Sequence, residues 1–263
     1  MGRLVLLNRH QVSARRGLII TGAAGTGKTT AVIQLGRNHE LLLRRRLGPQ
    51  AAERTPVVYL TVPPAATPKI LASEFAQFIG LPVASRQNQS DITNAVCDLL
   101  CRLRADLVLV DEIHNMNLAT IAGEDLSDHL KYFTEHLPAT FVYAGINVER
   151  CGLFTGMRGK QLAGRCTLIR TSAFPCNTEW QALIATFEDT LRLHHHQPGT
   201  LVSLARYLHQ RTGGMIGSLS HLIRAAAITA IIEGSEAITR TLLDTVALDY
   251  AAESATTGRR ATG

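Results

Sequence analysis

The chain has 263 residues, of which 46% are hydrophobic and 18% are charged, and its formal net charge is +6. These proportions exclude a disordered chain, and no apolar run approaches the roughly 18 residues that span a bilayer, so we expect a cytoplasmic protein without a membrane partner. A charge of this size permits a polyanionic partner such as nucleic acid but does not require one.

Short apolar runs rich in β-branched residues alternate with helical patterns as far as residue 172. The runs lie at residues 17–21, 56–62, 107–110, 139–145 and 166–170, and the helical patterns lie at about 28–46, 68–80, 90–104 and 118–137. Strands that alternate with helices of this length predict a parallel sheet with helices on both faces, because each connection between parallel strands needs a crossover. The expected fold class is therefore α/β.

Beyond residue 172 the sequence shows helical patterns alone. They cover residues 176–196, 199–211, 215–233 and 237–251, with QPG, TGG and EGS between them. We expect a core at residues 1–172, a small helical domain at 173–251 and a disordered tail at 252–263. The histidines at 194–196 could suggest a metal site, but their place at the end of a helical pattern favours a solvated helix end.

The first apolar run ends in TGAAGTGKTT, where Gly22, Gly27, Lys28 and Thr29 fit the pattern G-x-x-x-x-G-K-[ST]. Glycines let the backbone wrap tightly so that successive N–H groups face phosphate oxygens, and the following helix adds its positive amino-terminal end. In such a loop Lys28 reaches the β- and γ-phosphates of ATP, and Thr29 holds Mg²⁺. The nucleotide-contacting residues that we predict are Gly22, Ala23, Ala24, Gly25, Thr26, Gly27, Lys28, Thr29, Thr30 and Asp111.

Two adjacent carboxylates, Asp111 and Glu112, follow the apolar run at residues 107–110. Ligands of open α/β sheets bind at the carboxyl ends of strands, so Asp111 fits the carboxylate that steadies Mg²⁺, directly or through water. Adjacent side chains of a strand point to opposite faces. Glu112 therefore fits the base that polarises an attacking water. We interpret the two acids as parts of one ATP site rather than as a solvated acidic turn.

Fast hydrolysis also needs a contact to the γ-phosphate and a positive charge in the transition state. Asn147, in FVYAGIN after the fourth predicted strand, can hydrogen-bond the γ-phosphate or the water, and the alternative is a turn residue. Arg165 directly precedes the fifth predicted strand and can reach the nucleotide of a neighbouring subunit. The alternatives are a surface role for Arg165, with Arg158 or Arg150 as the arginine finger.

Segments spread over nearly the whole chain resemble AAA+ ATPases and, among them, the TniB/TnsC-type transposition regulators. These segments are GAAGTGKTT, VYLTVPPAATPKILASEF, LVLVDEIHNMN, QLAGR and TGGMIGSLSHLIRAAAITAIIEGSEAIT. The DEIHN form of the acidic motif and the small, alanine-rich helix of the last segment look more like TniB than like other AAA+ proteins. His114, within DEIHN, has no role that the sequence assigns.

The resemblance implies a three-layer P-loop core with strand order 5-1-4-3-2 and a helical lid at residues 173–251. It implies that Asn147 senses the γ-phosphate and that Arg165 is the arginine finger. It also implies ATP-dependent oligomerisation, as a ring or helical filament, on double-stranded DNA. A DDE transposase and a TniQ-like target-selection protein are the implied partners. One departure is that Gly217 stands where many AAA+ lids carry an arginine, in G-x-x-R.

The resemblance also indicates where DNA would bind, because proteins of this family line a central channel with residues from loops that follow the second strand. Lys69, after VPPAATP, and Arg86, in PVASRQNQS, occupy comparable places. We therefore expect both to contact phosphate groups of DNA. The alternative is that they are ordinary surface charges.

The hypothesis that follows is an ATP-dependent, DNA-binding regulator of transposition that recruits or activates a DDE transposase. Two alternatives remain open. One is a nucleotide-dependent signalling or defence switch of the STAND type, without a DNA partner. The other is a helicase loader, as in the DnaC/IstB branch. ATP and Mg²⁺ are the expected cofactors in each case.

Overall fold

A computed structural model describes residues 2–11, 13–116, 121–150, 161 and 163–248, and the chain divides into two compact units. The first unit comprises Met1–Ala23 and Lys28–Thr171, and the second comprises Ala24–Gly27 and Ser172–Gly263. The sequence indicates a change of architecture near residue 172, but it does not assign the tip of the glycine-rich loop to the helical part. The expected tail at 252–263 lies outside the described residues.

Five parallel strands form one sheet in the first unit, in the order β2-β3-β4-β1-β5. They are β1 (Gly17–Gly22), β2 (Val57–Thr61), β3 (Leu107–Asp111), β4 (Thr140–Gly145) and β5 (Cys166–Thr171). The order expected from the resemblance, 5-1-4-3-2, is confirmed. Every residue of β3 and β4 is buried, because neighbouring strands flank them and helices cover both faces, and this explains their continuous apolar runs.

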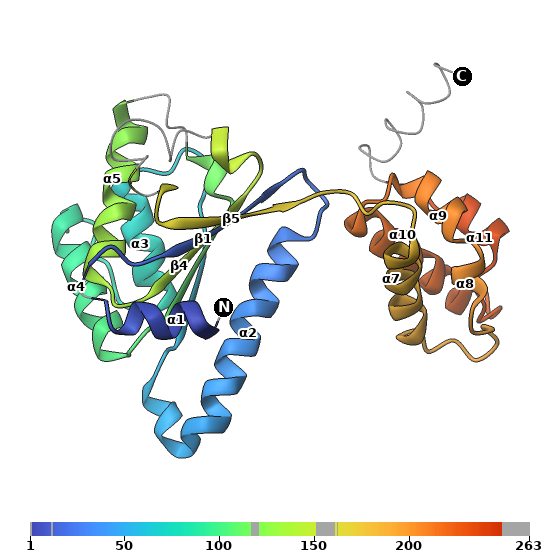
Figure 1. Cartoon of the computed structure of the whole chain (residues 1–263), viewed down its shortest axis with the longest axis horizontal. Coiled ribbons are helices and arrows are strands. Elements are labelled where there is room, and N and C mark those ends of the chain that lie inside the picture. The colour runs from blue at the N-terminus through green and yellow to red at the C-terminus, as the bar shows by residue number, and fades with distance from the viewer. Residues whose placement is uncertain (1, 12, 117–120, 151–160, 162, 249–263) are drawn as a thin grey trace. The chain divides into compact units, whose positions relative to one another are not determined.

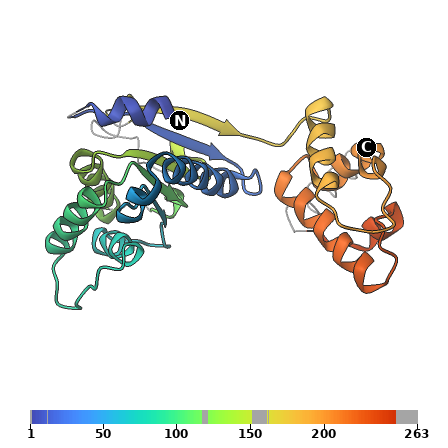
Figure 2. The same cartoon turned by 90° about the horizontal axis from the view of Figure 1, so that it is seen from below.

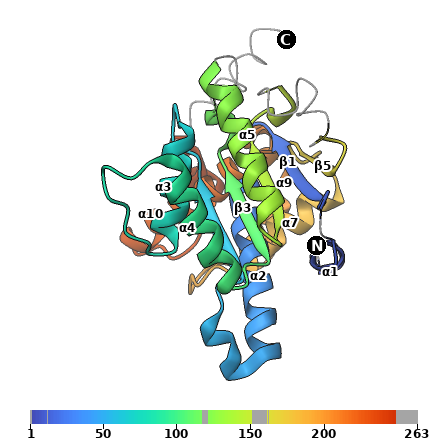
Figure 3. The same cartoon turned by 90° about the vertical axis from the view of Figure 1, so that its left-hand side faces the viewer.

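Helices cover both faces of the sheet, as Figures 1 and 3 show. They are α2 (Lys28–Leu47) on one face and α3 (Pro68–Phe78), α4 (Gln89–Arg102) and α5 (Ile121–His136) on the other. Leu107 and Leu109 of β3 pack with Val32 of α2. Val108 and Val110 belong to the cluster on the opposite face, with side chains of α3, α4 and α5. Alternate side chains of β3 thus belong to the hydrophobic clusters on the two faces of the sheet. The expected three-layer α/β fold is confirmed.

A helix that the sequence does not predict, α1 (Gly2–Arg9), precedes the sheet. Arg9 donates from Nε and Nη2 to the two carboxylate oxygens of Asp106, at 3.0 and 2.8 Å. Asn8 donates to the hydroxyl of Thr140 at 2.8 Å. Asp106 and Thr140 stand where β3 and β4 begin. A helix of eight residues is marginal in water on its own, so these tertiary contacts account for it, and no local pattern reveals them.

The second unit is built from helices (Figure 2), namely α7 (Thr178–Asp189), α8 (Thr200–Ser203), α9 (Ala205–Thr212), α10 (Ile216–Ile232) and α11 (Arg240–Thr245). They enclose Trp180, which is fully buried and donates from Nε1 to the carbonyl of Ala205 at 2.8 Å. In the part of the chain that is described, no single helix is long and apolar enough to cross a membrane. Helices α9 and α10 reach that length only as a pair bent by 114°.

The prediction of a solvated helix end at the histidines 194–196 is confirmed only in part: His194 and His195 are exposed, but the segment does not end a helix and the His196 side chain is buried. Helix α7 ends at Asp189, and the histidines lie in the connection to α8. The imidazole of His196 is buried, with its Nε2 3.0 Å from Glu188 Oε1, and its Nδ1 accepts the backbone N–H of Ile238 at 3.2 Å. A buried carboxylate eight residues earlier in the chain therefore holds this side chain inside the unit.

Candidate functional site

The glycine-rich loop connects β1 to α2 and carries two glycines in the left-handed region, Gly25 at φ 74° and Gly27 at φ 82°. Glycine adopts these angles without strain, and left-handed residues in a short loop turn successive backbone N–H groups toward one concave side. At Gly22 an added Cβ would collide with the backbone oxygen and the hydroxyl of Thr171 on β5. The glycine spacing is thus imposed by the loop conformation and by close strand packing.

Lys28 begins α2, and the residue is only 7% exposed. Its Nζ donates to the carbonyl of Ala23 at 2.6 Å, which holds the ammonium group beside the loop. Burial lowers the pKa of Lys28 below its usual value, and the negative charges of Glu112 and Asp111 oppose this shift. The lysine therefore lies within electrostatic reach of both acids of the predicted site.

Asp111 is the last residue of β3 and is almost fully buried. Its Oδ1 accepts the backbone N–H of Glu112 at 2.9 Å, and its Oδ2 accepts the hydroxyl of Tyr59 on β2 at 3.2 Å. Burial is the main cause that raises the pKa of Tyr59, so the hydroxyl stays protonated and can donate. Sequence reasoning missed Tyr59. Tyr59 and Thr61 alternate along β2 with apolar residues, and this alternation could have indicated a polar face of the strand.

The residues around the loop offer oxygen donors that suit a magnesium–nucleotide complex. Thr29 and Thr30 lie exposed in the first turn of α2. The hydroxyl of Thr29 and the carboxylate of Asp111 are ligands of the type that Mg²⁺ prefers, with the rest of its coordination left to water and phosphate. Within the described residues, no group of three or more His, Cys, Asp or Glu side chains is arranged to hold a metal ion.

Glu112 does not continue β3, so the interpretation of two acids on opposite faces of a strand is wrong in its geometry. The backbone of Glu112 is left-handed, with φ 55° and ψ 34°, and a short 3-10 helix, η2 (Ile113–Asn115), begins directly after it. This conformation costs a non-glycine residue roughly 1–2 kcal/mol, and such strain is found at functional sites. The turn leaves the Glu112 side chain 37% exposed beside the buried Asp111.

Asn147 lies just past β4, at the carboxyl edge of the sheet, and is exposed and left-handed at φ 46°. The residues on both sides of it are held in place. The backbone N–H of Ile146 donates to His114 Nδ1 at 3.2 Å. The backbone N–H of Val148 donates to the hydroxyl of Thr21 on β1 at 3.0 Å. The segment that carries Asn147 is thus fixed to η2 on one side and to β1 on the other.

Arg165 stands at the far end of its strand from the glycine-rich loop. Its carbonyl accepts the backbone N–H of Gly17 where β1 and β5 begin, and the two strands end at the pair of Gly22 and Thr171. Six residues of strand span about 20 Å, so a finger role for Arg165 is compatible only with a nucleotide held by a second copy. Arg158 lies outside the described residues, as does the side chain of Arg150.

The two residues predicted to contact DNA lie near each other. Lys69 is exposed in the first turn of α3, and its Nζ donates to the carbonyl of Ser85 at 3.4 Å. Ser85 directly precedes Arg86, which is also exposed, in the loop between α3 and α4. Two exposed cations on one surface suit a phosphate backbone. Contact between these residues and DNA stays a prediction.

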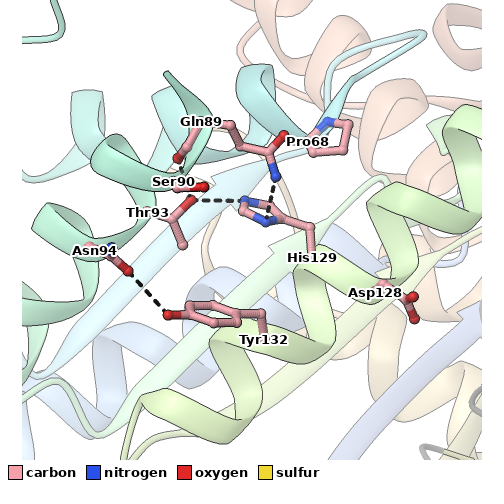
Figure 4. A pocket seen from close by; sticks show the side chains of 8 residues that line it. All are labelled: Pro68, Gln89, Ser90, Thr93, Asn94, Asp128, His129 and Tyr132. Atoms are coloured by element: carbon pink, nitrogen blue, oxygen red, sulfur yellow. Dashed lines mark hydrogen bonds between the residues drawn. The ribbon is translucent and has the colours of Figure 1, made fainter. Parts of the chain in front are cut away.

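A polar cavity of about 630 Å³ lies between α3, α4 and α5, with Pro68, the neighbour of Lys69, in its lining (Figure 4). The imidazole of His129 lies 3.2 Å from Gln89 Nε2 and 3.3 Å from the hydroxyl of Thr93. Burial lowers the pKa of His129 to about 4, so the ring is neutral at pH 7. This neutral network ties α5 to α4 beside the loop that carries Arg86, and no sequence pattern indicates it.

The family model of the AAA domain matches residues 10–149, which is more than half of the chain and includes Lys28, Asp111 and Glu112. No curated protein matches the sequence.

Several solved structures share the fold. The ORC2 protein of Aeropyrum pernix, in ADPNP–ADP complexes, is 18% identical over 97% of this chain and 66% of that chain, with a TM-score of 0.70. The ORC1 protein of the same organism, in complex with DNA, is 18% identical over 96% and 64%, with a TM-score of 0.65. DnaA of Aquifex aeolicus, bound to AMPPCP, is 16% identical over 89% and 62%, with a TM-score of 0.53. The likeness shows the fold alone, and the chain spans less than two thirds of the length of these proteins.

Proposed function

The chain belongs to the AAA domain family of P-loop ATPases, and from this premise we propose that it binds ATP with Mg²⁺ and hydrolyses it. The observation that carries the proposal is that Lys28, at the start of α2 after β1, and the acids Asp111 and Glu112, at the end of β3, stand at the same carboxyl edge of the parallel sheet. A P-loop lysine and two acids at this edge are the arrangement that phosphoryl transfer needs.

Each residue has its own task in this proposal. The backbone N–H groups of the loop and the ammonium group of Lys28 bind the β- and γ-phosphates. Thr29 and Asp111 would hold Mg²⁺, which neutralises negative charge on the phosphate oxygens. Glu112 accepts the proton of the attacking water, and Asn147 orients that water toward the γ-phosphorus. The bond from the γ-phosphorus to the bridging oxygen breaks, and ADP and phosphate are released.

We further propose that the protein works as a homo-oligomer, either a ring or a helical filament. If Arg165 is the arginine finger, its place at the opposite end of β5 from the loop means that its guanidinium completes the site of a second copy. An arginine supplied in trans stabilises the transition-state charge of phosphoryl transfer. Turnover in this account is therefore slow in the monomer and faster in the assembly.

The proposed function of the assembly is the regulation of transposition on double-stranded DNA in the cytoplasm, together with a DDE transposase and a TniQ-like target-selection protein. The DEIHN motif and the alanine-rich α10, which resemble TniB, support this proposal. The neighbouring exposed cations Lys69 and Arg86 also support it. ORC1 of Aeropyrum pernix, which shares the fold, was solved in complex with DNA, so DNA binding is compatible with this fold.

Assembly on DNA tests the proposed role. With duplex DNA and a non-hydrolysable ATP analogue, we expect rings or filaments in negative-stain electron microscopy, and we expect none for Lys28→Ala. A protein that binds the analogue but stays monomeric on duplex DNA would contradict the transposition role and favour a signalling switch. Assembly on single-stranded DNA alone would favour a helicase loader.

A further inference from the structure

We propose that His114 is a positioning residue that holds the carboxylate of Glu112 and links it to the segment that carries Asn147. The imidazole Nε2 lies 3.3 Å from Glu112 Oε2, and the imidazole Nδ1 accepts the backbone N–H of Ile146 at 3.2 Å. One ring therefore contacts both the proposed base and the neighbour of the proposed γ-phosphate contact. This inference rests on the proposed function, because it assigns a partner to the base of that reaction.

The two contacts fix the tautomer of the ring. Because the N–H of Ile146 points to Nδ1, that nitrogen has no proton and the ring proton of the neutral imidazole sits on Nε2. The protonated Nε2 then lies 3.3 Å from Glu112 Oε2, within ion-pair distance of a carboxylate that can only accept. At this distance the polar N–H attracts the negative charge of the carboxylate. The ring thus limits the positions that the exposed Glu112 can take.

The ring itself is held by a rigid platform. It belongs to η2, in which Ile113 is fully buried. Asn115, at the end of η2, donates from Nδ2 to the carbonyl of Val62 at 2.8 Å, and its backbone N–H donates to the carbonyl of Glu112 at 2.9 Å. On the other side, a Cβ at Gly145 would lie 3.1 Å from His114 Nδ1, so glycine lets β4 approach the ring without displacing it.

The ring of His114 connects η2 to the segment that carries Asn147. The N–H of Ile146 donates to the ring, and the N–H of Val148 donates to Thr21, so both neighbours of Asn147 are fixed to site residues. Because Ile146 directly precedes Asn147, the ring contacts both the proposed base and the backbone of the segment that carries the γ-phosphate contact. The geometry therefore joins the γ-phosphate contact to the base through a single side chain.

Two substitutions separate the two contacts of the ring. In His114→Gln the side-chain amide nitrogen takes the place of Nε2 and keeps a donor for Glu112, whereas in His114→Asn the side-chain oxygen takes the place of Nδ1 and keeps an acceptor for Ile146. His114→Ala removes both. We expect kcat for ATP to fall about tenfold or more in His114→Ala and His114→Asn, because both lose the polar contact with the charged Glu112, and to recover by at least about threefold in His114→Gln. The dissociation constant for ATP stays within about twofold, because the polar contacts of the ring are made with Glu112 and Ile146 and not with the glycine-rich loop.

A second readout needs no nucleotide. In ¹⁵N NMR spectra of the nucleotide-free protein, we expect the ring of His114 as the Nε2–H tautomer. We also expect the amide resonance of Ile146 to shift strongly in His114→Ala and His114→Gln but little in His114→Asn. A ring protonated on Nδ1 alone would overturn the inference, and so would an Ile146 amide that does not respond to His114→Ala.

The outcomes distinguish this inference from the proposed function. If Glu112→Gln turns over ATP normally, Glu112 is not the base and the proposed function fails at that step. If Glu112→Gln is inactive but His114→Ala keeps wild-type kcat, only the inference about His114 fails. Recovery in His114→Asn but not in His114→Gln would also overturn it, because the contact with Glu112 would then be irrelevant. Exposed His195, replaced by alanine, is the matched control and should change neither kcat nor the spectra. If His114→Ala unfolds, the comparison of His114→Gln with His114→Asn and the wild-type tautomer decide.

Discussion

The carboxyl edge of the sheet and the core of the helical unit use similar groups in different ways. In the helical unit, the buried carboxylate of Glu188 contacts His196 and accepts the backbone N–H of Leu201 at 2.8 Å. These groups thus satisfy one another's hydrogen bonds inside the unit. At the edge of the sheet, Glu112 and Asn147 have the strained left-handed backbone, and their side chains are partly or largely exposed.

The comparison shows that burial and ion pairing do not identify a functional site by themselves. A histidine–glutamate pair occurs in both regions, as His196 with Glu188 and as His114 with Glu112. The first pair is almost completely buried, so it can act only on stability. The second pair is partly exposed at the carboxyl edge of the sheet, so it can act on a ligand. Substitutions in the helical core should therefore change stability, and substitutions at the sheet edge should change binding and turnover.

The largest effect on stability is expected at Trp180. Trp180→Ala should lower the free energy of unfolding of the second unit by about 3–5 kcal/mol, because it leaves a large cavity and an unpaired carbonyl at Ala205. Trp180→Phe keeps most of the ring and should cost less. Urea titration of both variants should be followed by circular dichroism. Trp180 is the one tryptophan of the chain, so neither variant keeps a tryptophan fluorescence signal. A loss of unfolding free energy below about 1 kcal/mol in Trp180→Ala would contradict the conclusion that Trp180 is packed in the core of the helical unit.

A smaller effect should follow from the buried His129. Because its folded pKa is about 4, below the ordinary value, the unfolded chain takes up the proton first as pH falls. Stability contributed by the neutral ring is therefore present above about pH 6.5 and is lost as pH falls toward 4, by about 1–2 kcal/mol between pH 7 and pH 5. Denaturant titrations at both pH values should show this loss, and His129→Gln should reduce it. An equal loss in the wild type and in His129→Gln would contradict the assignment to this ring.

The smallest effect is expected for DNA affinity at Lys69. If Lys69 contacts a phosphate group, Lys69→Ala should lower the slope of log K against log salt concentration by about one unit. Lys131, which lies 3.9 Å from Glu135 on α5, provides a control substitution that should leave the slope unchanged. Fluorescence anisotropy with duplex DNA measures the slopes. Equal slopes for the wild type and Lys69→Ala would remove Lys69 from the DNA contacts.

The sequence predicts the sheet well because its signals are local. Each apolar run becomes a strand, and the glycine spacing before Lys28 matches a loop that needs glycine. What the sequence does not reveal depends on contacts between distant residues. Helix α1 is held by Asp106, far along the chain, and Tyr59 reaches Asp111 only because β2 and β3 are neighbours.

The turn at Glu112 is missed for a different reason. A strand pattern cannot show that a non-glycine residue adopts a left-handed backbone, because surrounding contacts impose that strain. His114 has no sequence signal for the same reason, since its two partners become neighbours only when β3 and β4 lie side by side.

The central claim is that Lys28 binds the nucleotide and that Glu112 acts on the attacking water. The most direct test measures ATP turnover and the binding of a fluorescent ATP analogue for Glu112→Gln and Lys28→Ala. We predict that Glu112→Gln loses at least about 100-fold in turnover but binds the analogue as the wild type does, whereas Lys28→Ala loses binding. Wild-type turnover in Glu112→Gln would contradict the claim.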